Sequence, residues 1–189
     1  RPRGADAAPL RGATALTSVS VWGPISLDDV IARYRRTVLG PLWLIIPQAL
    51  FILGIYTLHR QTMSASSPDF LPYLAISLPL WALLTALLVE TTASLLSVKG
   101  FIDSYALPLA IHIVRTVARS YIVFAHLLLV YFVVELAVHR SLPVTIIAAW
   151  PALAILAVFA LGAGLALAPL GARFRDVPPA LAALMMLGF

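Results

Sequence analysis

The chain has 189 residues, of which 61% are hydrophobic and only 11% are charged, and its mean hydropathy is +0.98. A soluble domain of this length needs far more charge to cover its surface, so the composition excludes that class and predicts a polytopic membrane protein. The net charge of +5 comes from residues between apolar runs, which favours membrane topology over nucleic-acid binding, and the lack of cysteine excludes disulfides and cysteine-bound metals.

The N-terminal part of the chain is basic and polar. Residues 1–25 are rich in Arg, Ala, Pro, Thr and Ser, which predicts a disordered cytoplasmic tail, with an organelle transit peptide as the alternative. Ser26 begins a capping-box-like pattern, and residues 26–37 predict a short amphipathic helix lying along the cytoplasmic interface. A basic cluster follows, made of Arg33, Arg35 and Arg36. Because arginines are costly to move across a membrane, this cluster anchors the next helix on the cytoplasmic side.

The remainder, residues 26–189, is predicted to be one all-α transmembrane domain, a polytopic helix bundle with about four complete spans and a truncated fifth. The predicted spans are 40–58, 72–96, 120–138 and 145–170, with a fifth opening at Val177. At a rise of about 1.5 Å per residue, helices of these lengths cross a hydrocarbon core of about 30 Å. The chain starts at Arg1 and stops inside an apolar run at Phe189, so we expect it to be a fragment.

The positive charges predict the orientation of the bundle. If the N-terminus is cytoplasmic, eleven of the thirteen Lys and Arg residues fall in cytoplasmic segments, and only Arg60 and Arg140 fall in outer loops. Such a bias is the positive-inside pattern of membrane proteins. The sequence therefore predicts a cytoplasmic N-terminus.

Two carboxylic acids and one histidine fall inside predicted spans, namely Glu90, Glu135 and His126. An acid within a span usually faces the bundle interior or an aqueous cavity. For Glu90 one alternative is a proton- or cation-coupling role. The other, which is favoured, is a position near the cytoplasmic end where it pairs with an arginine or extends to water. Glu135 has the same alternatives at the outer end. We expect His126 to hydrogen-bond between helices, because the histidines lack metal-site spacing. Ala160 and Gly164 have the spacing of a close helix–helix contact.

Aromatic residues recur through the first three predicted spans. Those that lie deep are Phe51, Trp81 and Phe124. Aromatic faces can stack on the C–H surfaces of sugars, so these rings are candidates for a glycan path, with lipid or core packing as an equal alternative. Trp43, Tyr73 and Tyr121 fall near predicted interfaces and fit an aromatic belt.

The segment 97–119 is too charged to span a membrane and too apolar for an ordinary linker. Residues 100–107 predict a short amphipathic helix that offers an apolar face to a cytoplasmic protein. That face consists of Phe101, Ile102 and Tyr105. Arg115 and Arg119 are four residues apart, so they share a helix face, and we expect them at headgroup depth below the third span. Their partner is predicted to be an anionic phospholipid or a lipid that carries a diphosphate.

Three stretches at predicted cytoplasmic boundaries form a pattern: RYRRTVLGPLW at 33–43, GFIDSYALPLAIHIVRTVAR at 100–119 and GARFRDV at 171–177. Together they resemble the membrane subunit of ABC-2 type polysaccharide exporters, in particular O-antigen (lipopolysaccharide) export permeases. The resemblance covers about residues 26–189. The family commonly has Asn where this chain has Ser120, and an amide or basic residue where it has Asp103.

The resemblance implies a six-helix subunit that works as a homodimer in the bacterial inner (plasma) membrane, with a separate ATP-binding subunit below each half. Its substrate would be a polysaccharide on undecaprenyl diphosphate, moved from the cytoplasm to the periplasm. Candidates for contact with the diphosphate are Arg33, Arg35, Arg36, Arg115 and Arg119. The coupling helix that docks on the ATPase would lie at about 98–107, with Gly100, Phe101, Ile102, Asp103 and Tyr105. The chain itself would bind neither a cofactor nor a metal, and ATP would act only through the partner subunit.

Other functions stay open at this point. The same fold exports capsule, teichoic acid or small hydrophobic drugs. An integral membrane enzyme acting on polyprenyl-phosphate lipids would need acidic clusters for Mg²⁺, whereas Asp103 and Asp176 stand alone in the sequence. A secondary transporter would show inverted repeats and charges in mid-membrane, for which Glu90 is the one candidate. No glycine-rich loop with a lysine is present, so we do not expect this chain to hydrolyse ATP. The resemblance implies a transport subunit rather than an enzyme.

Overall fold

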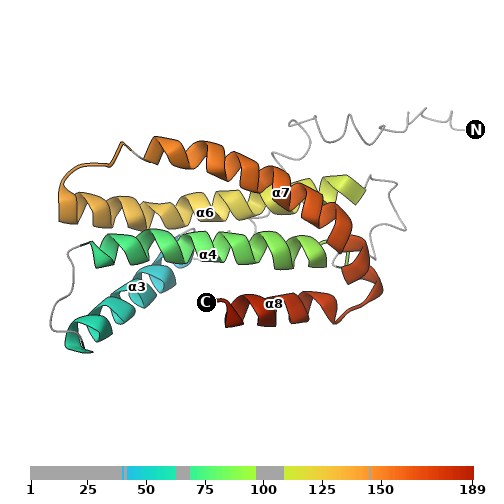
Figure 1. Cartoon of the computed structure of the whole chain (residues 1–189), viewed down its shortest axis with the longest axis horizontal. Coiled ribbons are helices and arrows are strands. Elements are labelled where there is room, and N and C mark those ends of the chain that lie inside the picture. The colour runs from blue at the N-terminus through green and yellow to red at the C-terminus, as the bar shows by residue number, and fades with distance from the viewer. Residues whose placement is uncertain (1–39, 41, 63–68, 97–108, 145) are drawn as a thin grey trace, which may run out of the picture.

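The computed structural model describes residues 40, 42–62, 69–96, 109–144 and 146–189. This part of the chain forms five α-helices and no strand, and four of the helices are long and apolar enough to cross a membrane (Figure 1). Their bounds are Leu42–Thr62 (α3), Phe70–Ala93 (α4), Leu109–His139 (α6), Ile146–Arg173 (α7) and Val177–Leu187 (α8). The described residues are thus all-helical, as predicted, and their four long apolar helices suggest a multi-pass membrane protein. The predicted tail (1–25), interfacial helix (26–37) and coupling helix (98–107) lie outside the described residues.

Helix α6 begins at Leu109, before the predicted start of the third span at Ser120. The predicted span begins after Arg119 because the segment 97–119 is too charged to cross a membrane. The helix itself starts earlier because its first turns also bury a face, with Ile113 and Val117 in the core. Similarly, α7 continues to Arg173, so the predicted loop 171–176 is shorter than expected.

Helix α4 is the centre of the bundle and contacts each of the other described helices. In Figure 1 it lies between α6 and α8, with α7 running along α6 and then turning toward the end of α4. Helix α3 contacts α4 and α6. In the apolar stretch of α4, 39% of the residues are buried, whereas in that of α3 only 6% are buried. Most of α3 therefore faces outward, as expected for a helix exposed to lipid.

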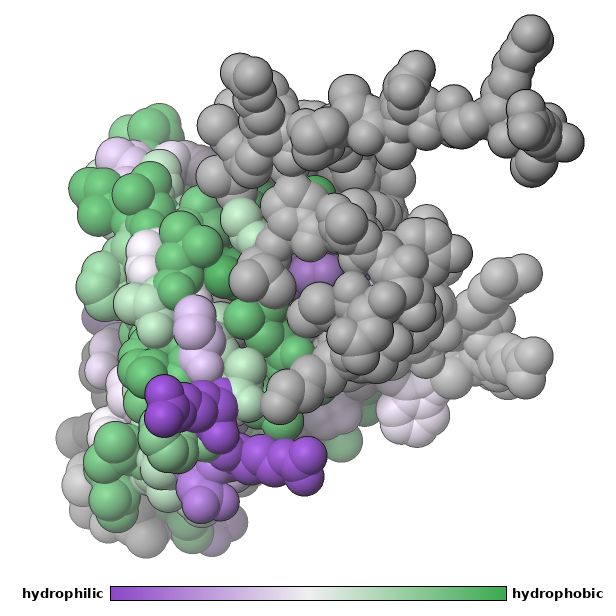
Figure 2. All heavy atoms as spheres, turned by 90° about the vertical axis from the view of Figure 1, so that its right-hand side faces the viewer, coloured by the Kyte–Doolittle hydropathy of each residue, from purple (hydrophilic) through white to green (hydrophobic). Residues whose placement is uncertain are grey.

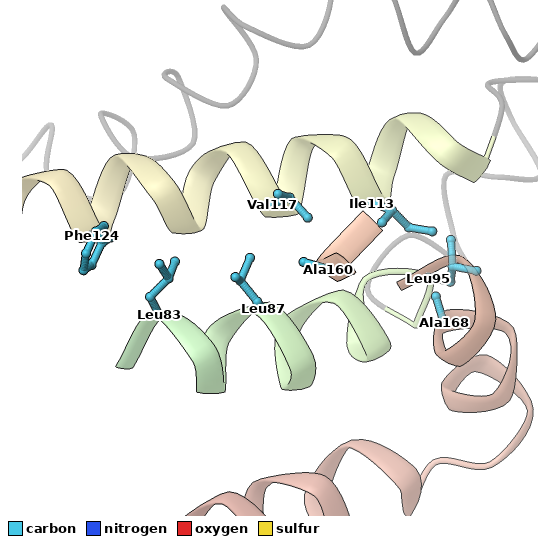
Figure 3. Close-up of a cluster of buried hydrophobic side chains, with 8 residues drawn as sticks. All are labelled: Leu83, Leu87, Leu95, Ile113, Val117, Phe124, Ala160 and Ala168. Carbon is cyan, nitrogen blue, oxygen red and sulfur yellow. The ribbon is translucent and has the colours of Figure 1, made fainter. Parts of the chain in front are cut away.

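The main core brings together one face each of α4, α6 and α7 (Figure 3). It contains Leu83, Leu87, Leu95, Ile113, Val117, Phe124, Ala160 and Ala168. A second cluster joins α3, α4 and the later part of α6, with Ile52, Leu74, Ala75, Leu78, Val130 and Tyr131. The two clusters line opposite halves of α4, which explains its central position.

A row of small residues brings α7 against α4 and α6. Its buried members are Ala160, Gly164, Ala168 and Gly171. A Cβ atom on Gly164 would lie 2.7 Å from Ile113 Cγ2, and one on Gly171 would overlap the main-chain oxygen of Thr92. The predicted close contact at Ala160 and Gly164 is confirmed, and it extends two helical turns further, where only glycine leaves room for the α4 backbone.

Candidate functional site

An ion pair joins α4 to α6 near one end of the bundle. Nη2 of Arg119 donates to Oε2 of Glu90 at 2.5 Å, and the two side chains are 30% and 45% exposed, respectively. Of the two positions expected for Glu90, pairing with an arginine or extension to water, the structure shows the pairing. Arg119, which was predicted to face a lipid diphosphate, already has an anionic partner within the chain.

A second polar cluster joins the same two helices at their other ends. Nε2 of His139 lies 2.9 Å from Oδ1 of Asp69, which precedes α4, and its Nδ1 lies 3.0 Å from Oε1 of Glu135. Glu135 is buried, so this contact satisfies a carboxylate that would otherwise be costly in an apolar setting. The sequence contained a signal for half of this cluster, since Glu135 and His139 are four residues apart on a helix. No local pattern pointed to Asp69.

The spacing of the two clusters matches the thickness of a membrane. Asp69 and Glu90 are 21 residues apart along α4, and Arg119 and His139 are 20 apart along α6. At about 1.5 Å per residue both intervals measure about 30 Å, which is the thickness of a bilayer's hydrocarbon core. Between the clusters α4 carries no Asp, Glu, Lys or Arg. The polar links therefore lie where the two hydrocarbon boundaries are expected.

Positive charge gathers at the end that holds Glu90. Among the described residues this end carries Arg115, Arg119, Arg173 and Arg175, whereas the opposite end carries Arg60 and Arg140. Figure 2 views the bundle from the first end and shows strongly hydrophilic side chains grouped at one edge of that face. Phe174, Arg175 and Asp176 are all exposed on the turn between α7 and α8. The residues of GARFRDV thus lie at the same end as the pair of Glu90 and Arg119.

The residues proposed for substrate contact have different surroundings. Arg115 and Arg119 lie one turn apart within α6 and are both half-buried. Arg33, Arg35 and Arg36 lie outside the described residues, as do the five predicted coupling residues from Gly100 to Tyr105. Of the predicted cationic group, the structure therefore describes only the two α6 arginines, of which Arg119 is the one bound to Glu90.

The three deep aromatic residues do not share a surface. Phe51 is 52% exposed on the outside of α3, whereas Phe124 is 5% exposed in the main core. Trp81 is half-buried on α4, with its ring centroid 6.2 Å from that of Phe189 beyond α8. Of the three, only Trp81 lines the groove that runs between α4 and α8.

Two side chains have hydrogen bonds that differ from the predictions. The expectation of an interhelical bond from His126 is wrong, because its Nδ1 lies 2.7 Å from the carbonyl oxygen of Ile122, one turn earlier in α6. Tyr121 makes an interhelical bond instead, donating to the carbonyl oxygen of Leu153 on α7 at 2.7 Å. The sequence did not indicate the partner of Tyr121, because that bond depends on which face of α6 meets α7.

Most hydroxyl groups near the Glu90 end bond to carbonyl oxygens of their own helices. Thr92 donates to Leu88 at 2.6 Å, and Thr116 donates to His112 at 2.9 Å. The exception is Thr85, whose Oγ1 is buried without a hydrogen-bond partner among the described residues. A buried hydroxyl without a hydrogen-bond partner is unfavourable, so the burial of the Thr85 hydroxyl calls for an explanation.

The described residues contain no group of three or more His, Asp or Glu side chains that could hold a metal ion. This part of the chain has a cationic end, an ion pair between Glu90 and Arg119 at that end, and a groove that Glu90 lines. No protein-family model, curated protein or solved structure matches the chain, so the resemblance to ABC-2 exporters rests on its three sequence motifs.

Proposed function

We propose that the chain is part of the membrane permease of an ATP-driven exporter of the ABC-2 type, which moves a polyprenyl-diphosphate-linked polysaccharide across the bacterial inner membrane. In this proposal the permease is a homodimer with its N-terminus in the cytoplasm. The energy comes from a separate ATP-binding subunit. The chain provides the path and the contact surface for that subunit.

One observation carries the proposal. The described parts of two motifs, residues 109–119 and 171–177, are far apart in the sequence but belong to the same end of a membrane-length bundle. Gly171, which opens the second of these, contacts the main chain of Thr92, just before the segment that leads to α6. This supports a common role for the motifs at one membrane boundary, as expected where a transport subunit meets a cytoplasmic partner.

The charges at this end suit a diphosphate-bearing lipid. Arg115 lies one turn beyond Arg119 on α6, on the side away from the hydrocarbon core, and Arg173 and Arg175 are at the same end. Guanidinium groups bind phosphate oxygens through paired hydrogen bonds. In the proposal these arginines attract the diphosphate, while the pairing of Arg119 with Glu90 keeps that guanidinium oriented at the boundary.

The function can be tested by gene deletion and complementation in the host. We expect deletion to remove the surface polysaccharide and to cause polyprenyl-linked polymer to accumulate inside, and the full-length gene to restore export. A deletion strain with normal surface polysaccharide and no internal polymer would contradict the export proposal.

A second test addresses the cationic end. With the ATP-binding subunit co-expressed, Arg115→Gln should lower export of the polymer, while Arg140→Gln at the opposite end should leave it near the wild-type level. Both proteins must first be shown to reach the membrane in equal amounts. Equal export by the two variants would remove Arg115 from the substrate path.

A further inference from the structure

A groove between α4 and α8 combines apolar side chains with a hydroxyl group and a carboxylate in its lining. Its volume is about 470 Å³, within the range of ligand sites, and Figure 1 shows the two helices side by side. Its lining includes Trp81, Thr85 and Glu90 from α4 and Met185, Met186 and Phe189 from the α8 region. By contrast, the groove of about 370 Å³ between α3 and α6 is lined by apolar side chains only.

From these features we propose that the α4–α8 groove binds one acyl chain of a zwitterionic phospholipid with a primary ammonium group, whose headgroup lies at the pair of Glu90 and Arg119. This role is separate from export and needs neither the ATPase nor the polymer. The lipid would seal the groove on the side of the membrane that holds the cationic end.

Charge complementarity selects the headgroup. Glu90 lines the groove and bonds to Arg119 of α6, so opposite charges meet at Glu90, and both side chains are partly exposed. Only one carboxylate oxygen is used in their contact, and a guanidinium has five N–H donors. The other carboxylate oxygen can therefore accept from the ammonium group while the guanidinium donates to the phosphate, and the ion pair persists.

The dimensions of the groove fit one leaflet. Trp81 lies nine residues before Glu90 on α4, a distance of about 13 Å along the helix. Half of a hydrocarbon core measures about 15 Å. Met185, Met186 and Phe189 add flexible and aromatic apolar contacts on the opposite wall, which suit an alkyl chain.

Thr85 lies between the headgroup site and the deep end of the groove. It is five residues, about 7 Å, from Glu90, which is the depth expected for the ester carbonyls below a phosphate group. Its Oγ1 is buried and has no hydrogen-bond partner among the described residues, although Thr85 itself lines the groove. In the proposed complex a rotation about the Cα–Cβ bond would turn this hydroxyl toward the lipid. An ester carbonyl oxygen would then accept the hydrogen bond that the hydroxyl lacks.

The test uses quenching of tryptophan fluorescence by brominated lipids in detergent solution. Changing Trp22, Trp43 and Trp150 to Phe leaves Trp81 as the single fluorophore. A matched control keeps only Trp150, which is 71% exposed on α7, outside the groove. The probes are phosphatidylethanolamine and phosphatidylglycerol with brominated acyl chains. Size-exclusion chromatography checks that each variant stays folded.

We expect quenching of Trp81 to saturate, with half-quenching at an about two- to fivefold lower concentration of phosphatidylethanolamine than of phosphatidylglycerol. Glu90→Gln should abolish this preference, while Glu90→Asp, which keeps the charge, should retain part of it. Thr85→Val should weaken binding of both lipids, whereas Thr57→Val, at an exposed α3 position where the hydroxyl bonds to Gly54, should not.

Two results would overturn the proposal. One is equal and non-saturating quenching of Trp81 and Trp150, which would mean that the groove holds no more lipid than the rest of the surface. The other is a headgroup preference that survives Glu90→Gln. Because the assay contains neither the ATP-binding subunit nor a polyprenyl lipid, its outcome is independent of the export proposal.

Discussion

Arg119 Nη2 lies 2.5 Å from Glu90 Oε2, and this contact links α4 to α6 about 30 Å from the place where His139 links the same helices. Since the hydrocarbon core of a bilayer has that thickness, the two links mark its expected boundaries. Glu90 and Arg119, whose charges would each be costly inside a bilayer, are thereby paired at an expected boundary.

The pair of Glu90 and Arg119 should contribute little to stability. Because both side chains are partly exposed, we expect a coupling energy of about 0.2–1 kcal/mol in a double-mutant cycle of Glu90→Gln and Arg119→Gln. The free energy of unfolding in mixed micelles measures it. As a control, Glu90→Gln combined with Arg140→Gln at the other end should be additive within about 0.5 kcal/mol. A coupling of several kcal/mol would indicate a far drier site.

Gly171→Ala should lower the free energy of unfolding by about 1–3 kcal/mol, because the new Cβ would overlap the main-chain oxygen of Thr92. Gly162→Ala on the same helix is the matched control, since nothing lies within 4 Å of the position that its new methyl group would occupy. That change should be neutral or stabilising by up to about 1 kcal/mol, because alanine favours a helix. Similar effects from the two substitutions would contradict the close approach of α7 to α4.

Tyr121→Phe should destabilise the contact between α6 and α7 by about 1 kcal/mol, because it removes the hydrogen bond to Leu153 and keeps the ring. Tyr73→Phe is the control, since Tyr73 is 63% exposed on α4. The measurement is again unfolding in mixed micelles. If both variants unfold like the wild type, the hydroxyl of Tyr121 does not hold the two helices together.

The orientation predicted from the positive charges can be tested directly, because the chain contains no cysteine. Single cysteines can replace two exposed residues at opposite ends, Ser141 and Arg175. In intact cells a membrane-impermeant thiol reagent should label Ser141→Cys at once and Arg175→Cys only after permeabilisation. The reverse pattern would overturn the predicted orientation.

The sequence predicted the existence and the order of the long apolar helices well, because the partitioning of a segment into a bilayer depends on the hydropathy of that segment alone. Every described span overlaps its predicted range. Hydropathy did not indicate how far α6 extends before the predicted span, since the helix begins at Leu109. Burial of Ile113 and Val117 against α4 and α7 adds these first turns.

The sequence by itself thus determined the four long apolar helices of the described residues and the end of the bundle that carries most of their positive charge. Only the tertiary structure decided the partners: Glu90 with Arg119, Tyr121 with Leu153, and Gly171 with the backbone of Thr92. These residues are 29, 32 and 79 positions apart, respectively. Which of them meet depends on how each helix is rotated about its axis, and that rotation is set by the packing of all the helices together.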